Sequence, residues 1–265
     1  MQVWHLSGAG NDFMVIDARG KHLNFESLSK KLCARTGADG FMAVDLAQDA
    51  DFTLHFYNSD GSRGEMCGNG SRCICRFAYD NGIAGETMTV HTDAGLVYGW
   101  RLTENQYRVK LNNPGVLDLN RLEAAAYVEL GCPGIPHSVT EVPNLDFDQK
   151  DRLRPLAKAL RFDPAFPKGV NVNFYRWTGP DAVQVLTYER GVEDYTLACG
   201  TGCGSVASVL HAKGQLPAGR LTCHVPGGTL QITVGAEKEA IHSIFLEGPA
   251  EIVQIYELDE HEITN

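Results

Sequence analysis

Alternating apolar and polar residues predict that most of the regular structure of this chain is β-strand. Stretches in which every second residue is apolar fit strands with one buried face. We expect strands at residues 3–6, 13–16, 52–57, 88–91, 97–102, 107–111, 172–175, 183–188, 221–225, 230–234 and 252–257. The clearest helical stretches are residues 28–33, 71–80, 148–160 and 204–213. Many strands with a few helices predict an α+β fold.

The most informative pattern is an internal repeat. Cys67-Gly68-Asn69-Gly70 matches Cys199-Gly200-Thr201-Gly202, and in each copy a strand that ends in a polar pair precedes the motif. A helical stretch follows each cysteine and stops at a glycine fifteen residues on, Gly82 or Gly214, before another strand. The cysteines are 132 residues apart, which is half the chain. This offset is too long for a solenoid and predicts two homologous domains facing each other.

The length of 265 residues also suggests two domains. The run at 111–115, which contains asparagine, proline and glycine, is the best candidate boundary. We therefore expect an N-terminal half at 1–115 and a C-terminal half at 116–265, whose final strand packs back on the first half.

A Cys-Gly-x-Gly motif before a helix has a definite chemical use. Glycine lets the backbone approach a ligand closely, and the free N–H groups of the helix start bind a carboxylate. The same field is expected to lower a thiol pKa toward neutrality. Two such thiols on opposite sides of one carbon form a base and an acid, which is the requirement for racemisation. Two other interpretations stay open, namely a turn with a buried cysteine and a redox pair.

Composition and charge exclude several other classes of protein. The formal net charge of −10 argues against a nucleic-acid partner, which would require clustered basic residues. No apolar run approaches the length of a membrane span, and we identify no signal peptide, so we expect a cytoplasmic protein with no membrane partner. The eight cysteines are then expected to be reduced, and without CxxC or zinc-ribbon spacing they predict no metal site.

Several longer strings are similar to the diaminopimelate epimerase family, in family order and across nearly the whole chain. The most specific is Glu65-Met66-Cys67-Gly68-Asn69-Gly70-Ser71-Arg72-Cys73. The others are Ser7-Gly8-Ala9-Gly10-Asn11-Asp12-Phe13, Gly37-Ala38-Asp39-Gly40, Phe56-Tyr57-Asn58-Ser59-Asp60-Gly61, Tyr188-Glu189-Arg190-Gly191 and Ala198-Cys199-Gly200-Thr201-Gly202.

The resemblance implies two pseudo-symmetric domains, each a barrel-like and mostly antiparallel sheet around a central helix, with the active site between them. It implies an isomerase of lysine biosynthesis that inverts an amino-acid α-carbon without pyridoxal phosphate or metal. The implied catalytic residues are Cys67, Cys199, His137 and Glu189. The implied substrate-binding residues are Asn11, Asn58, Gly68, Asn69, Asn171, Arg190, Gly200 and Thr201. A small amino acid is the expected partner, and a homodimer is left open.

Each polar candidate also has a structural interpretation. Asn11 and Asn58 fit turns, Asn171 fits a cap, Arg190 fits a surface ion pair, and a single buried histidine such as His137 is commonly structural. Cys73 is expected to be a core residue.

Two departures from the family pattern concern the substrate. Ile135 stands where the family typically has an asparagine that holds the far end of diaminopimelate, and losing a buried polar partner costs roughly 1–3 kcal/mol. The segment from Gly191 to Cys199 is one residue longer than expected and contains Tyr195. The main hypothesis is epimerisation of LL-diaminopimelate to the meso form. The alternatives are a racemase of another amino acid, such as histidine, and a non-catalytic amino-acid-binding or thiol-redox protein.

Overall fold

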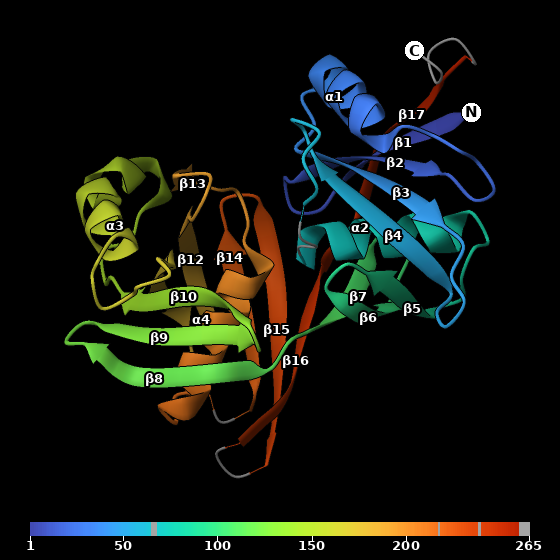
Figure 1. Ribbon diagram of the computed structural model, residues 1–265. Coiled ribbons are helices and arrows are strands. Elements are labelled where there is room, and N and C mark those ends of the chain that lie inside the picture. Colours follow the sequence, from blue (N-terminus) through green and yellow to red (C-terminus); the bar gives the residue numbers. More distant parts are fainter. Residues whose placement is uncertain (65–67, 217, 238–239, 260–265) are drawn as a thin grey trace. The chain divides into compact units, whose positions relative to one another are not determined.

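The computed structural model describes residues 1–64, 68–216, 218–237 and 240–259, and the chain divides into two compact units. Unit 1 comprises residues 1–109 together with those from 248 onward, and unit 2 comprises residues 110–247. Both units are rich in strands and contain few helices (Figure 1). The predicted α+β class is therefore confirmed.

Unit 1 contains eight strands and two helices in its described part. The strands are β1 (Gln2–Ser7), β2 (Asp12–Asp17), β3 (Gly40–Asp45), β4 (Phe52–Asn58), β5 (Thr87–Thr92), β6 (Gly95–Arg101), β7 (Gln106–Leu111) and β17 (Glu251–Glu257). The helices are α1 (Phe25–Thr36) and α2 (Gly68–Asp80).

Unit 2 contains the remaining elements. Its strands are β8 (Pro114–Leu122), β9 (Ala125–Gly131), β10 (Gly134–Glu141), β11 (Asn171–Gly179), β12 (Ala182–Glu189), β13 (Asp194–Tyr195), β14 (Arg220–Val225), β15 (Gly228–Glu237) and β16 (Ala240–Pro249). Its helices are the 3-10 helix η1 (Phe147–Leu153), α3 (Arg154–Arg161) and α4 (Gly200–Ala212).

The two units repeat one strand topology. In unit 1 the strands pair in the order β17-β1-β2-β3-β4-β5-β6-β7, with parallel pairs only at β2–β3 and β4–β5. In unit 2 the order is β8-β9-β10-β11-β12-β14-β15-β16, with parallel pairs only at β10–β11 and β12–β14. The sequence of parallel and antiparallel pairs is the same in both units. The final strand, β17, occupies in unit 1 the place that β8 occupies in unit 2.

A helix is buried against the sheet of each unit, and each begins at the glycine after a motif cysteine. Helix α4 contacts β8 to β11 as well as β14 and β15, and helix α2 contacts β1, β2 and β6. Both helices are largely buried, so polar side chains on them need hydrogen-bond partners inside the unit. In α2, Arg72 Nε donates to the carbonyl of Pro249 at 3.1 Å, and Arg76 donates to the carbonyl of Ala250 at 2.7 Å.

The helix predicted at 148–160 is divided in the structure. Residues Phe147–Leu153 form a 3-10 helix and Arg154–Arg161 an α-helix, with non-helical backbone at Gln149. Pro155 lies in the first turn of α3, where its missing N–H is tolerated, whereas the interior of one continuous helix would require that N–H.

Candidate active site

The thiol of Cys199 occupies the N-cap position of α4, with an extended backbone (φ −127°, ψ 106°). Its Sγ accepts a hydrogen bond from the amide of Gly202 at 3.4 Å and lies 3.5 Å from Oγ1 of Thr201. A cysteine here satisfies a free N–H of the helix start in the way that serine or aspartate does at other caps. The predicted motif geometry, a thiol before a helix N-terminus, is therefore present.

The pKa of Cys199 is shifted in the direction opposite to the sequence expectation. Burial of the thiol raises its pKa above the ordinary value, and the nearby carboxylate of Glu189 raises it further. The hydrogen bonds from Thr201 and Gly202 lower the pKa by less. The expectation that the helix start lowers the pKa of this thiol toward neutrality is therefore wrong for Cys199.

We expect iodoacetamide to label exposed Cys132 at least about tenfold faster than Cys199 at pH 7.5, because only the thiolate reacts. The labelling rate of Cys199 should keep rising above pH 9, the ordinary pKa of a cysteine thiol, because the pKa of Cys199 is raised above that value. The Cys199 thiol holds its proton more tightly in the folded than in the unfolded protein. The contribution of this thiol to the free energy of unfolding is therefore complete below about pH 9 and declines as pH rises further. Peptide mass spectrometry of timed samples measures both rates. A labelling rate of Cys199 that is already constant at pH 7 would contradict the raised pKa.

His137 and Asn171 stand beside each other on the parallel strands β10 and β11. The His137 side chain is fully buried, and burial lowers its pKa to about 3, with the charge of Arg190 adding to the shift. Its Nδ1 lies 3.1 Å from Nδ2 of Asn173, whereas its Nε2 has no hydrogen-bond partner among the described residues. The imidazole is therefore neutral, with one ring nitrogen available.

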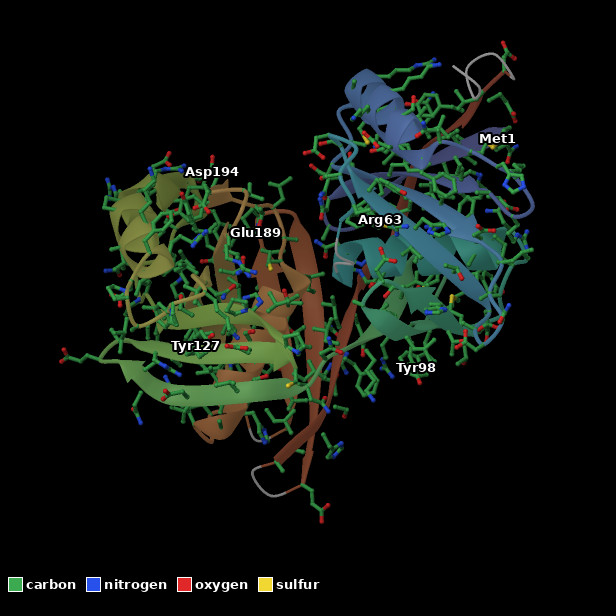
Figure 2. All side chains as sticks on the ribbon, in the orientation of Figure 1. Met1, Arg63, Tyr98, Tyr127, Glu189 and Asp194 are labelled. Atoms are coloured by element: carbon green, nitrogen blue, oxygen red, sulfur yellow. The ribbon has the colours of Figure 1, made fainter. Side chains whose placement is uncertain are left out.

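The amide of Asn171 is bonded to backbone on both sides. Its Oδ1 accepts from the backbone N–H of Arg190 at 2.9 Å, and its Nδ2 donates to the carbonyl of Pro136 at 3.2 Å. It therefore joins the ends of three strands, close to the capping role that the sequence also allows. Arg190 is exposed, and its Nη1 donates to the carbonyl of Lys168 at 3.0 Å. Glu189 ends β12 opposite Asp194 (Figure 2).

In unit 1, Asn11 and Asn69 lie together at the start of α2. Asn69 Nδ2 donates to Oδ1 of Asn11 at 3.4 Å, and Asn11 Nδ2 donates to Asp39 at 2.6 Å. Gly8 is required here, because a Cβ would lie 2.9 Å from the carbonyl of Asn69. The segment before Asn11 thus packs directly on the first turn of α2. Gly68 is the first residue of that helix, and Cys67 lies outside the described residues.

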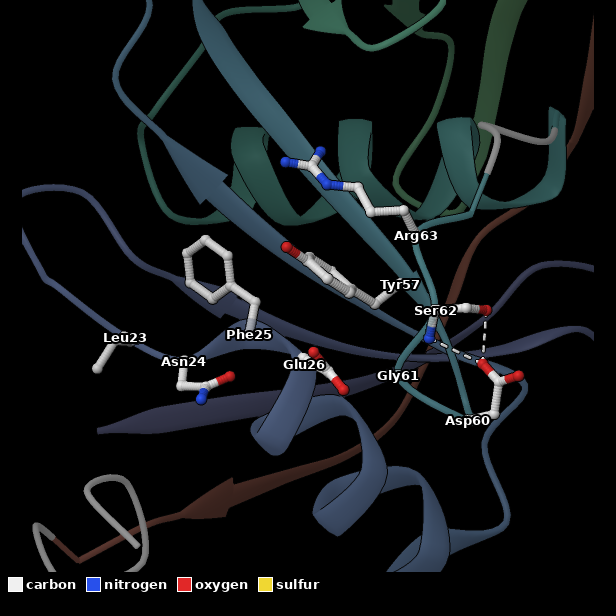
Figure 3. Close-up of a pocket in the computed structure, with 9 residues that line it drawn as sticks. All are labelled: Leu23, Asn24, Phe25, Glu26, Tyr57, Asp60, Gly61, Ser62 and Arg63. Atoms are coloured by element: carbon white, nitrogen blue, oxygen red, sulfur yellow. Dashed lines mark hydrogen bonds between the residues drawn. The ribbon is translucent and has the colours of Figure 1, made fainter.

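Asn58 is held in its own turn. Its Nδ2 donates to Oγ of Ser62 at 2.9 Å, and its carbonyl accepts from the hydroxyl of Ser29 at 2.5 Å. A groove on unit 1 adjoins this turn and none of the predicted site residues lines it (Figure 3). It is lined by Leu23, Asn24, Phe25, Glu26, Tyr57, Asp60, Gly61, Ser62 and Arg63.

The two departures have different structural consequences. Ile135 is half-buried on β10, two residues before His137 and hence on the same face of the strand. Tyr195 instead is half-buried against the core of unit 2, edge-on to Tyr188 with ring centres 5.4 Å apart and under the guanidinium of Arg154 at 5.2 Å. The longer segment therefore adds an aromatic side chain against the core of unit 2, beside the end of β12, whereas Ile135 shares the strand face of His137.

Asn173, Thr187 and Asp39 are the neighbours that sequence reasoning missed as contributors to this site. Asn173 and Thr187 are buried polar residues on β11 and β12, and their side chains bond each other at 2.9 Å. The alternation of Asn171 and Asn173 on a strand was the signal available, because two asparagines on one buried face require specific partners.

Within the described residues no group of three or more His, Cys, Asp or Glu side chains is placed to hold a metal ion. No helix in this part of the chain is both long and apolar enough to cross a membrane.

The family model for diaminopimelate epimerase matches residues 3–114 and 132–253. The chain belongs to the diaminopimelate epimerase family. The diaminopimelate epimerase of Aquifex aeolicus is 40% identical over 234 residues, covering 81% of this chain and 82% of the relative. That of Flavobacterium psychrophilum is 35% identical over 260 residues, covering 96% and 98%.

Solved structures agree with this assignment at the level of fold. A phenazine biosynthesis protein of the PhzF family from Bacillus anthracis superposes with a TM-score of 0.74, covering 98% of this chain and 99% of that one. The two are 14% identical, so the comparison concerns the fold alone. The predicted membership of the diaminopimelate epimerase family is confirmed.

Proposed function

We propose that this protein converts LL-diaminopimelate to meso-diaminopimelate by inverting one α-carbon, with Cys67 and Cys199 as the acid–base pair. The observation that carries the proposal is the position of Cys199 Sγ at the start of α4, in a motif that the chain repeats before α2. The relatives named diaminopimelate epimerase, which align over most of the chain, support the choice of substrate.

In the proposed reaction one thiolate removes the α-hydrogen, so that the Cα–H bond breaks and an S–H bond forms. The other thiol then donates its proton to the opposite face of the same carbon. One cysteine ends as a thiol and the other as a thiolate, and no redox change occurs. Because burial and Glu189 raise the pKa of Cys199, we assign it as the acid of the resting enzyme and Cys67 as the base.

The substrate α-carboxylate is assigned to the starts of α2 and α4, because the first N–H groups of a helix have no partner within the helix itself and favour anions. Gly68, Asn69, Gly200 and Thr201 are the residues concerned. The amide of Asn69 is positioned by Asn11, which supports a role for that pair in orienting the bound amino acid. Arg190 is assigned to the distal amino-carboxylate of the substrate. Its guanidinium supplies a positive charge there, whereas the side chain of Ile135 is apolar.

Incubation of the enzyme with LL-diaminopimelate in deuterated water should place one deuterium at the inverted α-carbon without added pyridoxal phosphate. Mass spectrometry and chiral chromatography measure exchange and inversion together. Heat-denatured enzyme is the control.

Ile135 favours a second candidate, a racemase that acts on an amino acid lacking the distal amino-carboxylate, such as histidine. Exchange with histidine but not with diaminopimelate would replace the first proposal by this one. Absence of exchange with either amino acid would leave a binding or thiol-redox protein.

A further inference from the structure

The fully buried amide of Asn173 lies between His137 and the first turn of α4. Its Nδ2 is 2.8 Å from the carbonyl of Ser138, 3.2 Å from the carbonyl of Asn171 and 3.1 Å from Nδ1 of His137. Its Oδ1 is 2.9 Å from the hydroxyl of Thr187. Every polar contact of this amide is thus to a named neighbour within unit 2.

These neighbours determine which way the amide points. Carbonyl oxygens only accept hydrogen bonds, so the NH₂ group must face Ser138 and Asn171. The Thr187 hydroxyl then donates to Oδ1. A flipped amide would place its oxygen against two carbonyl oxygens in a site without solvent, which is strongly unfavourable.

The orientation of the amide determines the proton on His137. The two N–H groups of this amide face three neighbours, so one N–H is shared between two of them. The NH₂ group cannot accept a hydrogen bond, and a protonated Nδ1 at 3.1 Å would set donor against donor, so Nδ1 of His137 is the bare nitrogen. In a neutral imidazole the proton is then on Nε2. This Nε2 is buried and has no partner among the described residues, so an N–H donor is left for a group that the unliganded chain does not supply there.

We propose that Asn173 is a positioning residue that holds His137 in its Nε2–H tautomer, so that His137 donates a hydrogen bond to an anionic group of the reaction. This inference rests on the proposed function. The family resemblance implies that His137 and Glu189 hold the substrate α-amino group and the thiol geometry. An Nε2–H cannot accept a hydrogen bond from an ammonium, so the structure favours the α-carboxylate or a cysteine thiolate instead.

The same amide touches the helix that bears Cys199. A Cβ on Gly202 would overlap Oδ1 of Asn173, so the amide lies directly against the first turn of α4. The N–H of Gly202 in turn bonds Sγ of Cys199. The side chain of Asn173 therefore contacts both His137 and the glycine whose N–H bonds the Cys199 thiol.

Nitrogen-15 NMR of histidine-labelled, unliganded enzyme reads the tautomer directly, with the His137→Gln spectrum used to assign the signal. Bare and protonated ring nitrogens have well-separated shifts. We expect a bare Nδ1 and a protonated Nε2 in the native protein. A protonated Nδ1 would overturn the proposal. Because no substrate is present, this result is independent of whether diaminopimelate is turned over.

Asn173→Asp replaces the donor by a carboxylate and should move the imidazole proton to Nδ1, or charge the ring. We expect kcat to fall roughly 10- to 100-fold, the range seen when a metal-bound histidine loses the group that orients it. Thr187→Val is the matched control, because it removes the partner of Oδ1 and leaves the bond to His137. It should retain the native NMR pattern. If Asn173→Asp keeps the native pattern, or Thr187→Val loses it, the orienting role of Asn173 fails.

Substitutions of His137 test whether its ring donates a hydrogen bond, independently of the role of Asn173. Glutamine has an acceptor and a donor where the ring has Nδ1 and Nε2, whereas leucine has neither. We expect His137→Gln to retain at least about tenfold more activity than His137→Leu, and equal activities would overturn the donor role. A rise mainly in KM for His137→Leu identifies the carboxylate as the anion, and slower iodoacetamide labelling of Cys199 at unchanged KM identifies the thiolate, because loss of the donor leaves less thiolate. Both of these results support a hydrogen bond from His137 to an anion and differ only in which anion receives it.

Discussion

Cys199→Ser should lower kcat for inversion by about 10²- to 10⁴-fold, the range that a positioned acid or base contributes. A serine hydroxyl keeps the cap bond to Gly202 but exchanges protons at the α-carbon far less readily than a thiol does. The free energy of unfolding should therefore change little. Initial rates of LL- to meso-diaminopimelate conversion, followed by chiral chromatography, measure the loss.

Cys223→Ala is the matched control, because Cys223 is equally buried in unit 2 but lies on β14, away from the motif. It should leave kcat essentially unchanged. The Cys199→Ser enzyme should still exchange the α-hydrogen of one stereoisomer, since Cys67 continues to act on its own face. Full epimerase activity in the variant would rule out Cys199 as a partner in inversion.

Gly202→Ala should damage stability and catalysis together. The added methyl group would overlap Oδ1 of Asn173 and come within 3.0 Å of Oγ1 of Thr187, both of them buried. Overpacking of this kind costs about 1–3 kcal/mol of unfolding free energy. The displaced amide would also release His137 and the Cys199 cap, and misplacement of about 1 Å lowers rates by up to about 10²-fold. Urea denaturation and steady-state kinetics measure the two effects.

Gly179→Ala is the control for the glycine substitution. A Cβ there meets only Ala182 at 3.6 Å, which is ordinary van der Waals contact. This variant should keep both the unfolding midpoint and kcat. If Gly202→Ala also kept both, the close packing of α4 against Asn173 would have no functional consequence.

The helices at the candidate site were predictable because their signals are local. Glycines beside Cys199, with the polar end of a strand before it and a final glycine after it, mark the beginning and end of α4 without knowledge of the rest of the fold. The repeat then predicted α2 by the same reasoning. The alternation of apolar residues also located the half-buried strands.

Three of the strands that sequence reasoning missed, β8, β9 and β10, lack this alternation. Nearly all of β9 is buried on both faces, so its apolar run does not distinguish a strand from a buried helix. Strand β10 begins with Gly134 and contains Pro136, which favour a turn. Strand β8 is largely exposed or half-buried and has no clear apolar face.

Two features of the site depend on tertiary structure and were beyond sequence reasoning. The pKa of Cys199 is set by competition between hydrogen bonds from its own loop and burial by the rest of unit 2, and only the first is local. The orientation of Asn173 needs partners from β10, β11 and β12 at once.

The place of β17 in unit 1 has a consequence for biosynthesis. This strand pairs with β1, and the residues just before it supply the carbonyls that bond Arg72 and Arg76 in the core helix. A nascent chain therefore carries β1 with an open edge, and two buried guanidinium groups without these partners, until residues after 248 have left the ribosome. Unit 2 is contiguous in sequence and has no such requirement. The half of the protein that is translated first is thus the last to be completed, and during that interval it is the half that most needs protection from aggregation.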